Sequence, residues 1–220
     1  MTIRNTNCVI ISSVNTLLDV IKSGVRSVMH QVARGLNAIT GGHLSPNTVT
    51  IVGFLAHIPI AWLIVTYHPI KAAVLLLVFG LFDTLDGELA RLQNRASAKG
   101  MLLDSITDRA KEIIIYTSFA YVIANSEWPI MSFWAASACG AALLVSYVNA
   151  WGEAVTARLH ITKHQLNKAF RTGLMPFEVR MAVVLVGLLS GRIILAVIVI
   201  TVGASLTAIY RLLNVFKQLA

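Results

Sequence analysis

The chain has 220 residues, of which 56% are hydrophobic and only 13% are charged, and its mean hydropathy is +0.74. A soluble domain carries about 25% charged residues, so this composition excludes a water-soluble globule and indicates an integral membrane protein. The length suits one compact set of membrane-spanning helices. The two cysteines, Cys8 and Cys139, are isolated, which argues against a disulfide framework and against a thiolate zinc site.

An amphipathic helix is predicted near the start of the chain, from about Val14 to Leu36. Apolar residues recur there at helical spacing, and a second stripe holds Lys22, Arg26, His30 and Arg34. This pattern predicts a helix lying in the membrane interface. A cytoplasmic helix packed on the membrane bundle is the alternative. Residues 1–43 are therefore predicted to form an N-terminal part that contains this helix and lies in the cytoplasm or at the membrane interface.

Six membrane-spanning helices are predicted in the remaining domain, 44–220. Three uncharged runs are long enough to cross hydrocarbon, which takes about 20 residues; they are Leu44–Ile70, Trp128–Gly152 and Ile193–Tyr210. Three shorter apolar runs become spans if one end of each helix is polar, and these helices are Lys71–Arg91, Gly100–Asn125 and Phe177–Gly191. The predicted fold is all-α, with six transmembrane helices after the interfacial helix.

The basic residues indicate the orientation of these spans. With six spans, Lys71 and Arg192 fall on one side of the membrane, and the other sixteen basic residues fall on the side of both termini. The positive-inside rule then places the termini and the polar helix ends on the cytoplasmic face of the cell membrane. The net charge of +8 follows from this topology and from contact with anionic membrane lipids, so nucleic acid is not the expected partner.

The most informative stretch contains four aspartates in two pairs. Asp83 and Asp86 are three residues apart, and Asp104 and Asp108 are four apart, so each pair shares a helix face. The first pair lies at the end of the second predicted span, and the second pair lies at the start of the third. Because the connection between the spans is short, the two helices are expected to run antiparallel and to bring all four carboxylates to one level at the cytoplasmic side.

Clustered carboxylates near hydrocarbon need a cationic partner, because one Asp costs about 2.5–3.5 kcal/mol at the centre of a spanning helix. A salt-bridge cluster is one possibility, with partners Arg91, Arg95, Lys99, Arg109 and Lys111. These basic residues mostly lie on connecting or flanking positions rather than between the acids. An all-oxygen site for Mg²⁺ or Mn²⁺ is therefore favoured, and zinc is not. Small residues beside the acids indicate close helix packing, a ligand against the backbone, or both.

The pattern D-x2-D-G-x2-A-R-x8-G-x3-D-x3-D is complete from Asp83 to Asp108 and resembles the signature of the CDP-alcohol phosphatidyltransferase family. The segment Ser45–Thr50 resembles the start of that family's first span. The resemblance implies the six-span fold and a homodimer. It also implies transfer of a phosphatidyl-type group from a CDP-linked lipid, such as CDP-diacylglycerol, to the hydroxyl of a polar acceptor, with release of CMP in phospholipid biosynthesis.

The resemblance also implies roles for individual residues. Asp83, Asp86 and Asp104 would bind the metal ions, and Asp108 would be the catalytic base or an added ligand. The residues at the CDP-lipid pocket would be Asn47, Thr48, Gly87, Ala90, Arg91 and Ser97. This agrees with general chemistry, since divalent ions neutralise a diphosphate leaving group and a nearby carboxylate can accept a hydroxyl proton.

Candidate residues for binding the acceptor are Arg158, Arg171 and Arg180. Basic residues after a span often serve only as topology determinants. However, the segment Arg171–Arg180 resembles one that lines the acceptor pocket in family members with phosphorylated acceptors, and arginine forks suit a phosphate monoester. Inositol phosphate or glycerol 3-phosphate is therefore favoured over inositol or serine. Trp151 and Gly152 depart from the family pattern in the fourth span.

Two rival functions come from other classes. A small transporter or cation channel would use the aspartates as an ion site, and an inactive membrane scaffold would have no use for them. Transporters place their acids near the midplane in broken helices. The aspartates here are expected at one cytoplasmic level, on continuous helices and without repeat symmetry, which favours the transferase.

Overall fold

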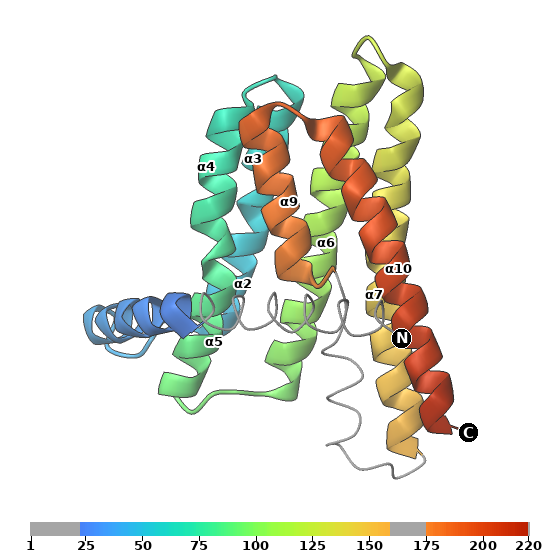
Figure 1. The fold of residues 1–220 in the computed structure, drawn as a ribbon. Coiled ribbons are helices and arrows are strands. Elements are labelled where there is room, and N and C mark those ends of the chain that lie inside the picture. Colours follow the sequence, from blue (N-terminus) through green and yellow to red (C-terminus); the bar gives the residue numbers. More distant parts are fainter. Residues whose placement is uncertain (1–22, 159–174, 220) are drawn as a thin grey trace. The chain divides into compact units, whose positions relative to one another are not determined.

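The computed structural model describes residues 23–158 and 175–219, and Figure 1 shows that these form helices. The N-terminal helix covers residues 23–39. It is followed by α2 (Pro46–Leu55), α3 (His57–Val65), α4 (Pro69–Gly80), α5 (Phe82–Leu92), α6 (Ala98–Ala124), the 3-10 helix η1 (Pro129–Met131), α7 (Ser132–Arg158), α9 (Phe177–Ser190) and α10 (Ile193–Leu219). No strand is found among the described residues, which agrees with the predicted all-α fold.

Three helical stretches in the described residues are long and apolar enough to cross a membrane. They are Pro46–Val65, Pro129–Val155 and Ile193–Lys217, and each overlaps one of the three uncharged runs of the sequence. Within the predicted first span, α2 begins at Pro46 directly after Ser45, and proline is well suited to the first position of a helix.

The three other predicted spans are helical but are not among these stretches. The second is divided at Leu81 into α4 and α5, and α5 carries most of the polar motif. The third is α6, which contains Asp104, Asp108 and several other charged residues. The fifth is α9, which has only 14 residues and ends at Gly191 with a φ of 68°. Their crossing of the membrane stays a prediction.

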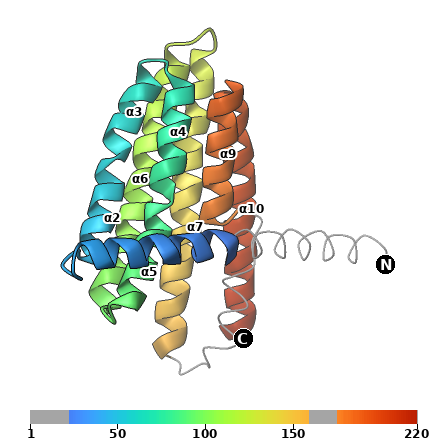
Figure 2. The ribbon, with the colours of Figure 1, turned by 90° about the vertical axis from the view of Figure 1, so that its left-hand side faces the viewer.

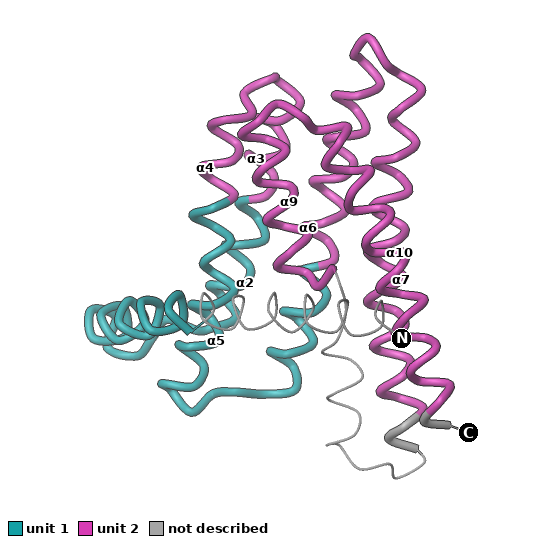
Figure 3. The backbone as a smooth tube through the Cα atoms, viewed as in Figure 1, with its two compact units in different colours: residues 1–56, 77–108 teal, residues 57–76, 109–220 magenta. Residues whose placement is uncertain are grey.

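The chain divides into two compact units, coloured separately in Figure 3. The first combines Met1–Ala56 with Leu77–Asp108, and the second combines His57–Leu76 with Arg109–Ala220. The first unit therefore contains both halves of the aspartate motif.

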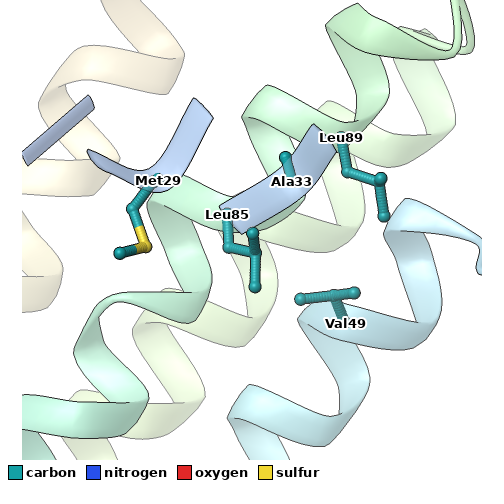
Figure 4. Packing of buried hydrophobic residues seen from close by; sticks show 5 residues of the cluster. All are labelled: Met29, Ala33, Val49, Leu85 and Leu89. Carbon is teal, nitrogen blue, oxygen red and sulfur yellow. The ribbon is translucent and has the colours of Figure 1, made fainter. Parts of the chain in front are cut away.

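In the first unit, the N-terminal helix packs against α2 and α5. Figure 2 shows it lying crosswise to α2. Its Met29 and Ala33 form a buried cluster with Val49, Leu85 and Leu89, drawn in Figure 4. The helix ends at a turn in which Gly41 and Gly42 have φ angles of 57° and 77°, a conformation that glycine adopts readily. Residues 14–22 of the predicted amphipathic helix lie outside the described residues.

In the second unit, α10 packs along α7 and also against α9. A buried cluster at the α7–α10 contact consists of three alanines and one valine, namely Ala141 and Val145 with Ala204 and Ala208. At the α9–α10 contact, a Cβ placed on Gly187 would come within 2.6 Å of the Ala196 Cβ. Small side chains let membrane helices approach closely without a hydrophobic driving force from water.

Candidate metal and nucleotide site

The structure brings together three of the four motif carboxylates. Asp83 lies in the first turn of α5, and Asp104 and Asp108 lie on α6. One carboxylate oxygen from each of the three lies within 4.8 Å of the others, and all three residues are half-buried. The short connection between the two helices was expected to bring the two aspartate pairs to one level. The positions of these three side chains agree with that expectation.

This group fits a hard divalent cation by its donor chemistry. It offers only carboxylate oxygens, which suit Mg²⁺ or Mn²⁺ better than zinc. Three carboxylates this close repel one another, and a bound cation removes that repulsion. Of the basic residues that a salt-bridge cluster would use, Arg91 pairs with Glu88 and Arg109 pairs with Glu112.

The fourth carboxylate, Asp86, is buried and has a different immediate partner. The Thr50 hydroxyl of α2 donates a hydrogen bond of 2.5 Å to Asp86 Oδ2. The charges of Asp104 and Asp83 also act on Asp86, although its oxygens are not part of the group of three. Asp86 is therefore held against α2 beside the cluster.

The predicted nucleotide-binding residues Asn47 and Ser97 meet at Gly100. The Ser97 Oγ accepts a hydrogen bond of 3.1 Å from the Gly100 backbone N–H, as a residue capping the start of a helix does. A Cβ on Gly100 would lie 3.4 Å from both Asn47 Oδ1 and Ser97 Oγ. Asn47, Ser97 and Gly100 therefore lie next to one another where α2 and α6 approach. Thr48 is exposed on α2, next to Asn47.

The predicted nucleotide-binding residues Gly87, Ala90 and Arg91 lie on α5. The Arg91 guanidinium folds back along the helix, so a Cβ on Gly87 would lie 3.5 Å from Arg91 Nη2. The same Nη2 donates a hydrogen bond of 2.6 Å to Glu88 Oε1. The structure thus places Arg91 beside the motif glycine.

The predicted acceptor-binding arginines lie in different settings. Arg171 is outside the described residues, and Arg158 is the last residue of α7, with its side chain outside the described part. Arg180 lies on α9 and is only 1% exposed. Its Nε and Nη2 donate hydrogen bonds of 2.7 and 2.9 Å to the two Glu112 oxygens, and its Nη1 donates one of 2.8 Å to the Met175 carbonyl.

The structure adds three residues that the sequence did not predict as part of the site. Thr50 holds Asp86, Glu88 holds Arg91, and Arg211 of α10 is a buried arginine close enough to Arg180 to be affected by its charge. The Arg211 Nε has no hydrogen-bond partner in the part of the chain that the structure describes. The sequence signal for Arg211 is a basic residue just after the last uncharged run, because ionisable residues in such helices are functional candidates.

Comparison with known proteins gives one family. Residues 43–209 match the family model described as CDP-alcohol phosphatidyltransferase. A phosphatidylinositol phosphate synthase of Cutibacterium acnes is 29% identical over 143 residues, which cover 63% of this chain and 67% of that protein. One of Corynebacterium glutamicum is 34% identical over 120 residues, which cover 50% of this chain and 52% of that protein. The matches thus span from about half to two thirds of these relatives.

Solved structures share the fold. A crystal structure of Mycobacterium tuberculosis phosphatidylinositol phosphate synthase with CDP-DAG bound matches with a TM-score of 0.74 and 23% identity, covering 87% of this chain and 94% of that one. A structure of the same protein in complex with manganese and citrate matches with a TM-score of 0.73 and 23% identity, covering 86% and 89%. At this identity the likeness concerns the fold alone.

Proposed function

The chain belongs to the CDP-alcohol phosphatidyltransferase family, and we propose that it transfers a phosphatidyl-type group from a CDP-linked lipid to a hydroxyl group of a polar acceptor, releasing CMP. The observation that carries this proposal is the group formed by Asp83, Asp104 and Asp108. The motif halves that supply these residues are separated in sequence, yet their carboxylates converge. The family match fits this reaction and not the alternative of a transporter or channel.

Asp83, Asp86 and Asp104 would hold Mg²⁺ or Mn²⁺, and Asp108 would be a further ligand or the base. A bound divalent ion would neutralise the diphosphate and the charge that develops on departing CMP. The manganese in the structure of the Mycobacterium tuberculosis synthase supports this choice of metal. Thr50 would keep Asp86 oriented, since its hydroxyl donates to that carboxylate.

Asp108 lies one helical turn beyond Asp104 and is half-buried, as a base reached by a polar acceptor requires. Its carboxylate would take the proton of the acceptor hydroxyl. The acceptor oxygen then bonds to the lipid-side phosphorus of the donor, and the bond from that phosphorus to the bridging oxygen breaks. CMP leaves with the electron pair of that bond.

Residues of the first unit would bind the nucleotide end of the donor. Asn47 and Ser97 lie together at Gly100, and Arg91 lies along Gly87. CDP-diacylglycerol is the proposed donor, which the CDP-DAG bound in the Mycobacterium tuberculosis structure supports. Its acyl chains would remain among the membrane lipids while the diphosphate meets these residues.

We propose a phosphorylated polyol as acceptor, with inositol phosphate or glycerol 3-phosphate as the best candidates. Relatives named phosphatidylinositol phosphate synthase support the first. In the second unit, the guanidinium of Arg180 is engaged by Glu112 and Met175, whereas the Nε of the buried Arg211 has no hydrogen-bond partner among the described residues. Arg211 therefore joins the candidate residues for a phosphate monoester. Arg158 and Arg171 remain predicted acceptor ligands.

The family is membrane-associated, and three described helical stretches are suited to crossing a bilayer. The proposed topology has an N-terminal part, 1–43, and a domain of six spans, 44–220. It places both termini and the aspartates on the cytoplasmic side of the inner membrane, as the distribution of basic residues favours. A homodimer is part of the proposal.

The reaction can be tested with purified full-length protein and labelled CDP-diacylglycerol. CMP release is measured with Mg²⁺ or Mn²⁺ and each of four acceptors, namely inositol phosphate, glycerol 3-phosphate, inositol and serine. We expect release with a phosphorylated acceptor, and its loss on chelation and in Asp83→Asn and Asp104→Asn. Glu127→Gln, a change at an exposed acid, is the matched control and keeps wild-type activity. CMP release that survives chelation or persists in both aspartate variants would contradict the proposal.

The role of Asp108 needs a separate variant. Asp108→Asn should lower kcat by about 10²- to 10⁴-fold, the usual contribution of a general base. Manganese binding, measured by calorimetry, should weaken far less than in Asp104→Asn. Unchanged turnover in Asp108→Asn would remove the base assignment and leave the metal site in place.

A further inference from the structure

Glu88 lies inside the aspartate motif, between Gly87 and Leu89, but has no part in the proposed reaction. Its side chain is only 6% exposed. A buried carboxylate is costly unless charged or hydrogen-bonded partners compensate it. The partners of Glu88 therefore indicate why this position carries an acid.

Three basic groups converge on the Glu88 carboxylate. Arg91 Nη2 lies 2.6 Å from Oε1, and Arg26 Nε lies 3.5 Å from the same oxygen. His30 Nδ1 lies 3.2 Å from Oε2. Arg91 belongs to the same helix as Glu88, whereas Arg26 and His30 come from the N-terminal helix. One carboxylate thus joins a predicted nucleotide-binding residue to a separate segment of the chain.

The N-terminal helix is fastened along α5 at further points. Met29 and Ala33 pack against Leu85 and Leu89, as Figure 4 shows. Farther along, the Gln93 side-chain amide donates hydrogen bonds of 2.9 Å to both Asn37 Oδ1 and the Leu44 carbonyl. The contacts of Arg26 and His30 with Glu88 are therefore made from a helix that other contacts hold in place.

Arg91 is the exposed end of this chain of contacts. Its side chain is 55% exposed, in contrast to the buried Glu88. A guanidinium carries five N–H donors, so the contact with Glu88 through Nη2 restrains the side chain and leaves other donors for a phosphate. The position of Nη2 beside Gly87 directs the group along the motif backbone.

We propose that Glu88 is a positioning residue for Arg91: supported by Arg26 and His30, it holds the Arg91 guanidinium ready for the diphosphate of the CDP-linked lipid. This inference rests on the proposed function. A flexible arginine loses side-chain entropy when it binds, and fixing it beforehand reduces that loss. The N-terminal helix thereby contributes to nucleotide binding without contacting the nucleotide itself.

If Glu88 acts only through its negative charge, the opposite effect on binding of the diphosphate is expected. A carboxylate beside a diphosphate site repels the ligand, so its removal would tighten binding. Glu88→Gln separates the two possibilities, because it keeps the side-chain size and removes the charge. Positioning predicts weaker binding, and simple electrostatics predicts stronger binding.

The test is calorimetric titration of CDP, with Mn²⁺ present, into full-length protein in detergent. Glu88→Gln should weaken CDP binding about tenfold, and Arg26→Gln about threefold. In the Glu88→Gln background, Arg26→Gln should have no further effect, because it acts through Glu88. Glu127→Gln, the matched control, should bind CDP like the wild type. In turnover, Glu88→Gln should raise KM for CDP-diacylglycerol and leave kcat within twofold.

Wild-type or tighter CDP binding in Glu88→Gln would overturn the inference. So would an undiminished effect of Arg26→Gln in the Glu88→Gln background. If Glu88→Gln does not fold, Arg26→Gln alone decides, since Arg26 is 67% exposed, and wild-type CDP binding in this variant would overturn the inference. Failure of the proposed function is a separate result, because the wild type would then neither bind CDP nor release CMP.

Discussion

Single side chains of the motif have clearly different surroundings, although the motif presents them as equivalent acids. Asp83, Asp104 and Asp108 share one small volume, whereas Asp86 accepts a hydrogen bond from Thr50. A hydroxyl donor fixes the orientation of a metal-binding carboxylate and its lone pairs. We therefore expect Thr50 to influence metal affinity without being a ligand.

Thr50→Val tests this expectation. The change removes a hydrogen bond to a charged group, which is worth about 1.5–3 kcal/mol. The Mn²⁺ concentration for half-maximal CMP release should rise at least about tenfold, and Thr50→Ser should restore much of the loss. Thr66→Val is the matched control, because the Thr66 hydroxyl donates to the Trp62 backbone carbonyl. Equal Mn²⁺ dependence in Thr50→Val and wild type would show that Asp86 needs no support from α2.

The contacts that sequence reasoning missed join positions far apart in the chain. Thr50 and Asp86 are 36 residues apart, and Glu112 and Arg180 are 68 apart. The spacing within a motif indicates which residues share a helix face, but not which other helix that face meets. The aspartate cluster was predictable because a short connection forces its two halves together. The partners of Asp86 and Arg180 depend on the packing of distant helices and leave no local pattern.

At the scale of helices, the uncharged runs predicted the three apolar stretches well, because length and hydropathy alone define them. The division of the second predicted span at Leu81 was not predicted. The N-terminal helix was expected either in the interface or packed on the bundle. Its described residues pack on α2 and α5 through Met29 and Ala33, a contact that its apolar stripe allowed but did not identify.

The contact between α9 and α10 depends on the absence of a side chain at Gly187. A Cβ there would lie 2.6 Å from the Ala196 Cβ. Overpacking of this kind costs about 1–3 kcal/mol. Gly187→Ala should therefore lower the midpoint of thermal unfolding in detergent.

Gly140→Ala on α7 provides the matched control for Gly187→Ala. A Cβ on Gly140 would meet nothing within 4 Å, and alanine favours a helix over glycine by about 1 kcal/mol. This variant should be as stable as the wild type or more so. Equal changes of the unfolding midpoint in both variants would show that α9 and α10 do not pack tightly at Gly187 in solution.

For the molecule as a whole, the proposed site should link metal binding to stability. A ligand at about 100 times its Kd stabilises the folded state by about 2.7 kcal/mol. Saturating Mn²⁺ should therefore raise the unfolding midpoint by about 5–10 °C. The increase should be lost in Asp83→Asn and Asp104→Asn and retained in Glu127→Gln. An unchanged increase in the two aspartate variants would place the metal elsewhere.

The first unit is discontinuous in sequence, because Leu77–Asp108 joins Met1–Ala56 while the chain between them belongs to the second unit. During synthesis, the N-terminal helix and α2 emerge before α5, which supplies Leu85, Glu88 and Leu89, and before Gln93, which follows α5 directly. At about 5–20 residues per second, the ribosome needs about 2–7 s to reach the end of α5 from Ala56. In a nascent chain stalled before Phe82, Met29, Ala33 and Val49 would thus lack their partners on α5. These apolar side chains would be exposed to the translocation machinery or to the bilayer surface.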